Sequence, residues 1–347
     1  MEVIYGLNNI KRYKNPVVAI GVFDGVHRAH RRILQNLVRT ARRIKGTGIV
    51  LTFSPHPRKE GSLSSLDHRM HLLESLGVDA GIILDFNRSF ARISAARFVK
   101  EILSGKIKAR YVCVGENFRF GKHAQADAGT LRSFARYYGF KVKIFRTIRF
   151  KGNPVSSTAI RKLIADGKLA DAEKLLLRPV SVLGKVIKGT SIATALGFPT
   201  ANIKPDHEVL PPPGVYAANA LLGDKKLSAI AYVGAKPTFT PLEKVTGFSG
   251  RPAGFYADDG LIMPPSVKTV RGRNSLIGFP RGSRRDGNKK IVEVHIFAFE
   301  KNIYGKDMEV QFIKKIREEK KFASSQLLIK QIKKDIVSAK KILLSHS

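Results

Sequence analysis

The chain has 347 residues, of which 43% are hydrophobic, and these values are typical of a globular protein with two domains. Sixty-two Lys and Arg residues against 27 Asp and Glu give a formal net charge of +35, which attracts phosphate-bearing partners, either nucleotides or nucleic acid. The first residues lack the apolar stretch of a signal peptide, and no apolar run is close to the length of about 20 residues that a membrane span needs. Cys113 is the only cysteine of the sequence. We therefore expect a cytoplasmic protein without membrane segments, disulfides or a cysteine-built metal site.

Residues 15–150 alternate short apolar runs with amphipathic stretches. The runs are apolar on both faces, as buried strands are, and comprise 16–23, 48–53, 80–86, 109–115 and 140–145. The stretches with apolar residues at helical spacing are 31–44, 65–77, 94–105 and 129–140. This alternation predicts a doubly wound α/β domain with a parallel sheet, in which ligands bind beyond the carboxyl ends of the strands.

The first apolar run leads into Gly-Val-Phe-Asp-Gly-Val-His-Arg-Ala-His, residues 21–30. His27 and His30 then lie at the N-terminus of the following helix, where free N–H groups and the helix dipole favour a phosphate. Gly21 and Gly25 allow a tight turn and close approach of the backbone to a ligand. Imidazoles at such a site can donate hydrogen bonds to phosphate oxygens during phosphoryl or nucleotidyl transfer. Two surface histidines on an ordinary loop are the alternative interpretation, which the strand–helix context disfavours.

Residues 155–180 predict two short helices, with N-cap candidates at 156–158 and a break at Gly167. The pattern changes from Val180 onward. Short runs without intervening helices predict an antiparallel barrel or sandwich and comprise 180–189, 214–223, 226–234, 290–300 and 307–316. A closing helix with Lys on its outer face is expected at 324–344.

These patterns divide the chain into a first domain at 1–180 and a second at 181–347. The second domain carries an atypical insertion at about 241–290, rich in Gly, Pro and Arg and without a sustained period. A loop of that length inside a compact domain is either functional or disordered, and we expect a mobile surface segment rather than an ordered lid.

A second motif, Leu-Gly-Phe-Pro-Thr-Ala-Asn-Ile, occupies residues 196–203. Thr200 and Asn202 offer hard oxygen ligands, and Mg²⁺ prefers one or two protein oxygens together with phosphates and water. An ordinary turn is the alternative interpretation, and the residues alone leave the two open.

Residues 21–30 resemble the nucleotidylyltransferase signature of the bacterial bifunctional riboflavin kinase/FMN adenylyltransferases, the prokaryotic FAD synthetases. Residues 51–57, 114–129 and 155–161 resemble further motifs of that family in the same order. The Pro-Thr-Ala-Asn of the second motif resembles the hallmark of the riboflavin kinase domain, and the stretches from 212 onward follow the family's order. The resemblance covers nearly the whole chain except residues 241–290. It implies a Rossmann-like FMN adenylyltransferase domain followed by a β-barrel riboflavin kinase domain with a C-terminal helix.

The resemblance implies FAD biosynthesis with ATP as co-substrate, Mg²⁺ as cofactor, and riboflavin, FMN and FAD as substrates and products. Glu293 is implied as the general base that accepts the riboflavin hydroxyl proton, and His27 and His30 as the groups that stabilise adenylyl transfer. The implied ATP- or substrate-binding residues are Gly21, Phe23, Asp24, Gly25, Asn117, Ser157, Thr158, Arg161, Thr200, Asn202 and Arg317. Thr200 and Asn202 are also the implied Mg²⁺ ligands.

The chain departs from the family at Ala29, where the family has Gly between the two histidines. A methyl group at this point would crowd ATP, so we expect weakened rather than abolished adenylyl transfer. One alternative function is an enzyme that retains a single activity, with riboflavin kinase the favoured one. The other is a basic nucleic-acid-binding protein on this scaffold, which the intact motif residues disfavour. Small molecules are therefore the expected partners, nucleic acid is not expected, and self-association stays open.

Overall fold

The computed structural model describes residues 1–55, 61–188, 196–205, 208–234 and 291–346. The predicted insertion at 241–290 lies outside these ranges, as does most of the loop that precedes Leu196. Within the described ranges, no helix combines the length and the apolar character needed to cross a membrane.

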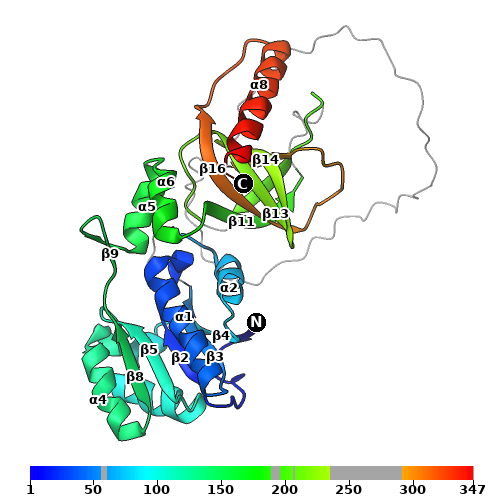
Figure 1. Ribbon diagram of the computed structural model, residues 1–347. Coiled ribbons are helices and arrows are strands. Elements are labelled where there is room, and N and C mark those ends of the chain that lie inside the picture. Colours follow the sequence, from blue (N-terminus) through cyan, green and yellow to red (C-terminus); the bar gives the residue numbers. More distant parts are fainter. Residues whose placement is uncertain (56–60, 189–195, 206–207, 235–290, 347) are drawn as a thin grey trace, which may run out of the picture. The chain divides into compact units, whose positions relative to one another are not determined.

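All five strands predicted for the first domain form, and an exposed strand at the edge adds a sixth. They build one parallel sheet in the order β1-β4-β3-β2-β5-β8 (Figure 1). The strands are β1 (Glu2–Tyr5), β2 (Val17–Ile20), β3 (Gly48–Ser54), β4 (Ala80–Asp85), β5 (Tyr111–Gly115) and β8 (Lys141–Phe145). Strand β2 pairs with β3 on one side and with β5 on the other, so the strand order reverses at β2. The loop after β2 therefore lies at a topological switch point, where ligands of such sheets bind.

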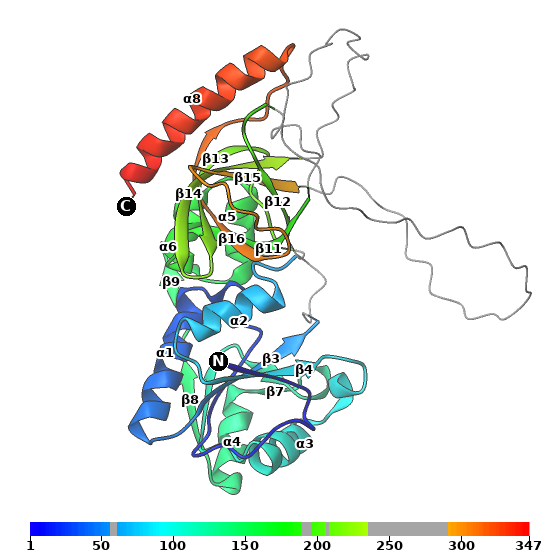
Figure 2. The same cartoon turned by 90° about the vertical axis from the view of Figure 1, so that its right-hand side faces the viewer.

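Helices cover both faces of this sheet (Figure 2). Helices α1 (Arg28–Arg43) and α2 (Leu66–Glu74) bury apolar side chains on one face, around Leu34 and Leu37. On the other face lie α3 (Ala95–Arg97), its continuation η3 (Phe98–Lys106) and α4 (Ala128–Tyr138). Short turns complete this part of the chain: η1 (Asp24–Val26), η2 (Phe90–Arg92) and η4 (Lys122–Ala124). The doubly wound fold predicted from the sequence is confirmed.

Two small hairpins and two helices lead to the second domain. The pairs are β6 (Arg119–Phe120) with β7 (Ala126–Asp127), and β9 (Arg149–Phe150) with β10 (Asn153–Pro154). Helices α5 (Ser157–Ala165) and α6 (Leu169–Leu176) follow, as predicted. Their apolar faces belong to the same core cluster as the interior of the second domain, although the first turn of α5 belongs to the first domain's site.

The second domain is a closed barrel of six antiparallel strands in the order β11-β12-β15-β14-β13-β16. The strands are β11 (Val180–Ile187), β12 (Ala201–Pro205), β13 (Gly214–Leu222), β14 (Lys225–Gly234), β15 (Ile291–Ile296) and β16 (Asp307–Arg317). Along β15 the side chains of Val292, Val294 and Ile296 are buried, whereas Glu293 and His295 alternate with them on the other face. The sequence pattern left a barrel or a sandwich open, and the barrel that the family resemblance implies is confirmed.

The closing helix α8 (Ser325–Leu344) packs on the outside of the barrel against β13, β14 and β16 (Figure 1). Its apolar side, including Ala339 and Leu343, contacts a cluster with Ala217 and Ile230. Asp335 is the one charged residue that is buried on this side of the helix, at 2% exposed. Its carboxylate accepts hydrogen bonds from Arg317 on β16.

Candidate active sites

The turn after β2 has an unusual backbone. Phe23, Gly25 and Val26 all have positive φ values, of 54°, 72° and 40°. A Cβ atom on Gly25 would lie 2.6 Å from Cδ1 of Leu63, so only glycine fits this position. Positive φ at a β-branched residue such as Val26 is strained, and strain of this kind is concentrated at ligand sites.

Asp24, in the same turn, is 2% exposed and is fully engaged by its own chain. Its Oδ1 accepts hydrogen bonds from the backbone N–H groups of Leu63 (2.8 Å) and Ser64 (3.2 Å). Its Oδ2 accepts one from Nη1 of Arg161 at 3.0 Å. Asp24 therefore fixes the loop and the arginine around the turn, and an additional direct role toward ATP stays a prediction.

The predicted Ser-Ser-Thr motif joins the same turn from the start of α5. Ser157 Oγ donates to the backbone carbonyl of Asp24 at 3.0 Å, and Arg161 Nη2 donates to Thr158 Oγ1 at 3.1 Å. The structure thus brings Ser157, Thr158 and Arg161 to the turn that carries the histidines. Ser157 and Asp24, which are in contact here, lie 133 residues apart in the sequence.

His27 and His30 form a stacked pair, with ring centroids 3.6 Å apart, and the edge of Phe23 lies against His30 at 5.2 Å. His27 precedes the first turn of α1, and none of the described side chains caps the N–H groups of that turn. By contrast, α2, α4, α5 and α8 are each capped by a Ser or Asp side chain. The N-terminus of α1 thus keeps the free N–H groups that bind anions.

Burial lowers the pKa of His27 to about 4 and holds the pKa of His30 well below its usual value. The nearby charges of Arg178 and Arg69 lower the pKa values of His27 and His30 further. Both rings are therefore neutral at pH 7, when each carries one N–H donor.

Several buried nitrogen atoms around this pair have no hydrogen-bond partner within the part of the chain that the structure describes. They are Nδ1 of His27 and of His30, Nε of Arg69, and Nε and Nη1 of Arg178. Unpartnered buried donors are costly, and guanidinium groups bind phosphate oxygens in a bidentate way. The cluster is thus suited to a phosphate chain.

Arg69 and Arg178 were not predicted from the sequence. Arg69 lies on the apolar stripe of α2 with Leu66, Met70 and Leu73, and an arginine on such a stripe is a signal that could have identified it. Arg178 lies between α6 and β11 in no periodic pattern, and only the fold brings its charge close to His27.

Asn117 follows the carboxyl end of β5 and is exposed, with its amide donating to Thr147 Oγ1 at 3.1 Å. A group of partly buried phenylalanines also gathers near the carboxyl ends of β3 and β4. The rings of Phe53, Phe86 and Phe90 have centroids 5.8 to 6.0 Å apart. These rings were not predicted as site residues, because apolar residues at strand ends are common.

A buried polar network joins the loop of the first site to the barrel. Glu208 accepts hydrogen bonds from the backbone N–H groups of Ser65 (2.7 Å) and Leu183 (3.0 Å), and its Oε1 lies 3.0 Å from Nδ1 of His68. Nε2 of His68 lies 3.7 Å from Glu309 on β16. Burial by itself lowers the pKa of His68, but the two carboxylates outweigh it and raise the pKa to about 9.

The raised pKa of His68 predicts that stability falls in mildly alkaline solution. The protonated form is favoured in the folded protein, so its contribution is complete below the unfolded pKa of about 6.5 and is lost as the pH rises to about 9. We expect the free energy of unfolding to fall by about 3 kcal/mol over this range, measured by urea unfolding. His68→Gln should remove this decline, whereas His71→Gln, on the exposed side of the same helix, should keep it. An unchanged decline in His68→Gln would show that another group titrates.

The second site lies on the outer face of the barrel. In the register of the sheet, Asn202 on β12 lies directly opposite Glu293 on β15, and Tyr232 on β14 lies opposite Glu293 on its other side. Residues paired in this way project from the same face of a sheet. The structure thus brings Asn202 and Glu293 together, and Thr200 directly precedes β12.

Glu293 is partly buried, and none of the hydrogen bonds seen among the described residues involves its carboxylate. Burial raises its pKa above the usual value for glutamate. The neighbouring Tyr232 hydroxyl donates to Glu319, and His295 Nδ1 lies 2.8 Å from the carbonyl of Pro199 in the second motif. A carboxylate with a raised pKa can accept a proton from a substrate hydroxyl.

Arg317, a predicted ligand contact, lies at the end of β16. Its Nε donates to both oxygens of Asp335, at 2.9 and 3.2 Å, and its guanidinium lies 5.6 Å from the ring centroid of Phe322. Arg317 therefore ties the barrel to α8, and a contact with flavin or phosphate stays a prediction.

Two family models match the chain. The model described as FAD synthetase matches residues 9–159, and the model described as riboflavin kinase matches residues 176–248 and 275–343. The unmatched stretch 249–274 falls inside the segment that the sequence sets apart as an insertion.

Similar proteins match over nearly their full length. A bifunctional riboflavin kinase/FMN adenylyltransferase of Escherichia coli is 31% identical, with 98% of this chain and 97% of the relative covered. Proteins described in the same words from Haemophilus influenzae and Buchnera aphidicola are 31% and 30% identical, with 98% of each chain covered. A solved structure from Streptococcus pneumoniae, described as a macrolide-efflux protein, is 25% identical, with a TM-score of 0.73 over 98% of this chain and 99% of the other.

Proposed function

The chain belongs to the family of bifunctional riboflavin kinase/FMN adenylyltransferases, and from this premise we propose how its two sites divide the synthesis of FAD. The enzyme phosphorylates riboflavin to FMN with one ATP and adenylylates FMN to FAD with a second. We assign the first step to Asn202 and Glu293 on the barrel and the second to His27 and His30 after β2. The observation that carries the second assignment is the cluster of buried nitrogens around the histidines that find no hydrogen-bond partner among the described residues.

In the kinase step, the 5′-hydroxyl of riboflavin attacks the γ-phosphorus of ATP. A bond forms between the hydroxyl oxygen and phosphorus, the bond to the β,γ-bridging oxygen breaks, and ADP leaves. Glu293 accepts the hydroxyl proton, and its raised pKa brings it closer to the value that suits a general base near neutral pH. The adjacent Tyr232, opposite Glu293 in the sheet, donates its hydroxyl hydrogen bond to Glu319 and would line one side of this site.

The residues of the second motif fit Mg²⁺ as the metal of the kinase step. Thr200 and Asn202 offer oxygen ligands only, and Asn202 lies opposite the Glu293 carboxylate. Mg²⁺ takes one or two protein oxygens with phosphates and waters, so two such residues suffice. Bound there, the metal supplies positive charge against the ATP phosphates. Asn202 would orient the phosphates toward the hydroxyl that Glu293 deprotonates.

In the adenylyltransferase step, a phosphate oxygen of FMN attacks the α-phosphorus of ATP. The bond to the α,β-bridging oxygen breaks and pyrophosphate leaves, without a proton to be removed by the enzyme. The neutral rings of His27 and His30 donate hydrogen bonds to the phosphate oxygens as charge builds up. Arg69 and Arg178 hold the triphosphate in place, while Asp24 keeps the surrounding loop fixed.

We place the isoalloxazine ring of FMN against the aromatic group of Phe53, Phe86 and Phe90. These partly buried rings lie near the carboxyl ends of β3 and β4, at the edge where the histidines also lie. Planar flavin and phenylalanine rings stack favourably. Asn117, at the end of β5, lies at this same edge of the sheet and would contact the substrates there.

The assignment of each step to its own site is tested by inactivating one site at a time. His27→Ala has to slow FAD formation at least about 10²-fold while sparing FMN formation, and Glu293→Gln has to do the reverse. Cytoplasmic location is part of the proposal, supported by the single cysteine, Cys113, which is buried and has no partner for a disulfide.

Ala29 lies in the first turn of α1, between the two histidines. We expect Ala29→Gly to raise kcat/KM for ATP in FAD formation about fivefold, because it relieves crowding of about 1 kcal/mol against the nucleotide. FMN formation should not change. Ala96→Gly, at an exposed position in the first turn of α3, controls for the loss of helix stability that glycine brings. Equal FAD formation by Ala29→Gly and the wild type would show that the methyl group does not touch ATP.

A further inference from the structure

A basic pocket of about 840 Å³ lies at the amino edge of the parallel sheet. Three separate segments line it, at 10–16 before β2, at 104–110 before β5, and at 138–139 before β8. Because the strands are parallel, this edge is opposite to the one that carries His27 and His30. The pocket is therefore distinct from the adenylyltransferase site.

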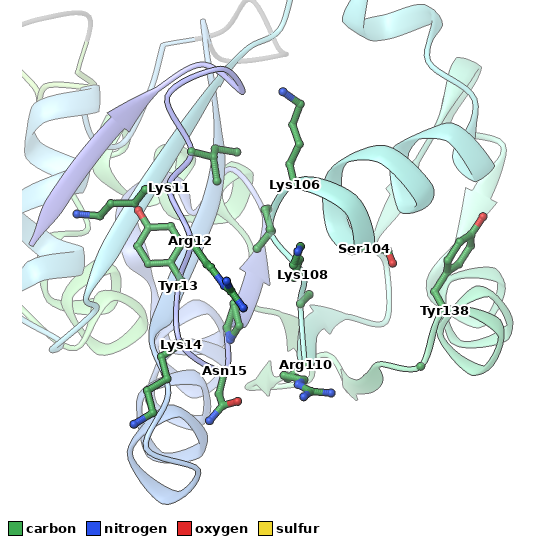
Figure 3. A pocket seen from close by; sticks show the side chains of 15 residues that line it. Lys11, Arg12, Tyr13, Lys14, Asn15, Ser104, Lys106, Lys108, Arg110 and Tyr138 are labelled. Carbon is green, nitrogen blue, oxygen red and sulfur yellow. The ribbon is translucent and has the colours of Figure 1, made fainter.

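Charge is what distinguishes this pocket. Its lining holds six cationic residues and no Asp or Glu, and the cations are Lys11, Arg12, Lys14, Lys106, Lys108 and Arg110 (Figure 3). Two of them have partners in the chain, since Lys11 pairs with Glu2 at 2.7 Å and Lys106 donates to the carbonyl of Leu7 at 3.2 Å.

The other four are exposed, and their side chains have no acidic partner among the described residues. In Figure 3, Arg12 reaches from the segment before β2 toward the side on which Lys108 and Arg110 lie. Like charges held together in a concave site repel one another and concentrate a positive potential, which favours a multiply charged anion.

An aromatic pair lies at one side of the pocket. Tyr138 lines the pocket and is partly buried against the core, and its neighbour Tyr137, outside the lining, is 83% exposed, with the two ring centroids 4.9 Å apart. Bases stack on exposed aromatic rings while cations follow the phosphates, which is how proteins bind single strands. The volume is also in the range of small-ligand pockets.

We propose that this basic pocket binds the consecutive phosphates of a single-stranded RNA or of a free nucleoside polyphosphate, apart from both active sites. The shared chemistry is a chain of phosphates next to a base. Arg12, Lys108 and Arg110 contact the phosphates, and the exposed ring of Tyr137, next to Tyr138 in the lining, offers a base a stacking surface.

The test compares two variants of the full chain with equal net charge. The pocket variant carries Arg12→Gln, Lys108→Gln and Arg110→Gln. The control variant carries Lys330→Gln, Lys333→Gln and Lys334→Gln, which are exposed on α8. One probe is a fluorescein-labelled single-stranded RNA of mixed sequence, followed by anisotropy at several salt concentrations. The other is inorganic tripolyphosphate, followed by calorimetry.

We expect the pocket variant to bind at least one probe about tenfold more weakly than the control variant does. If RNA is the ligand, the slope of log affinity against log salt should also fall by about 2, the loss expected for three phosphate contacts. A difference with RNA alone assigns the pocket to a strand, and a difference with tripolyphosphate assigns it to a free polyphosphate.

Equal affinities of the pocket and control variants for both probes would overturn the proposal, because binding would then follow the diffuse charge of the surface or the nucleotide sites of the two domains. FAD formation from FMN and ATP should match the wild type in both variants, which shows that each is folded. The single variant Arg12→Gln, in an exposed loop, repeats the test with little disturbance of the fold. Its affinity for the same probe should also fall, but by less than that of the triple variant.

Discussion

Replacing His27 or His30 by Ala is expected to lower kcat for FAD formation from FMN by about 10²- to 10³-fold, the usual cost of losing one donor to a developing charge. The two rings are stacked at 3.6 Å and lie at the uncapped start of α1. Because they form one unit, the double variant should fall only slightly below either single variant. Separation of the flavin products by chromatography with fluorescence detection measures the rates.

FMN formation from riboflavin should be retained within about twofold in the same variants, because the barrel residues are untouched. His71→Ala is the matched control, since His71 is exposed on the adjacent helix α2 and should retain both activities. Normal FAD formation in His27→Ala would remove the histidine pair from the mechanism.

The Glu293→Gln variant is expected to form FMN about 10²- to 10⁴-fold more slowly, because the amide keeps the shape of the side chain but cannot accept the proton. FAD formation from added FMN should continue. In the wild type, the rate of FMN formation should rise with pH as Glu293 loses its proton, at a pKa raised by burial, and then level off. This rise should be absent from the residual activity of the variant.

Glu300→Gln provides the control for the same chemical change, since Glu300 is exposed shortly after β15. A Glu293→Gln variant with the wild-type rate and pH profile would mean that another group accepts the hydroxyl proton.

The fold could be predicted from the sequence where burial is complete. The four inner strands of the first sheet are apolar on both faces and stand out from their surroundings. Strand β8 was predicted as a buried strand, but it lies at the edge of the sheet and exposes Lys141 and Lys143. Strand β1, with only Ile4 buried, and β12, which begins at the polar second motif, lack that signal and were not predicted as strands. A short strand is fixed by its neighbours in the sheet, and such pairing is not visible in a local pattern.

The sites could be predicted only in part. Sequence motifs predicted His27, Asn202 and Glu293, and the fold places the last two directly opposite each other. The motifs do not distinguish a residue that would contact ATP from one that holds the site in place. Asp24 belongs to the second kind, because its carboxylate accepts three hydrogen bonds from its own chain. Arg178 reaches the histidines only through the tertiary fold, so no spacing in the chain could predict it.

One paired measurement tests the central claim, that a single chain carries both activities. Purified protein is incubated with riboflavin, ATP and Mg²⁺, and separately with FMN, ATP and Mg²⁺, and the flavins are separated and quantified. FAD from both reactions, with FMN as an intermediate in the first, is the predicted result. FMN that accumulates without FAD, or FAD from added FMN alone, would contradict the claim by leaving only one working site.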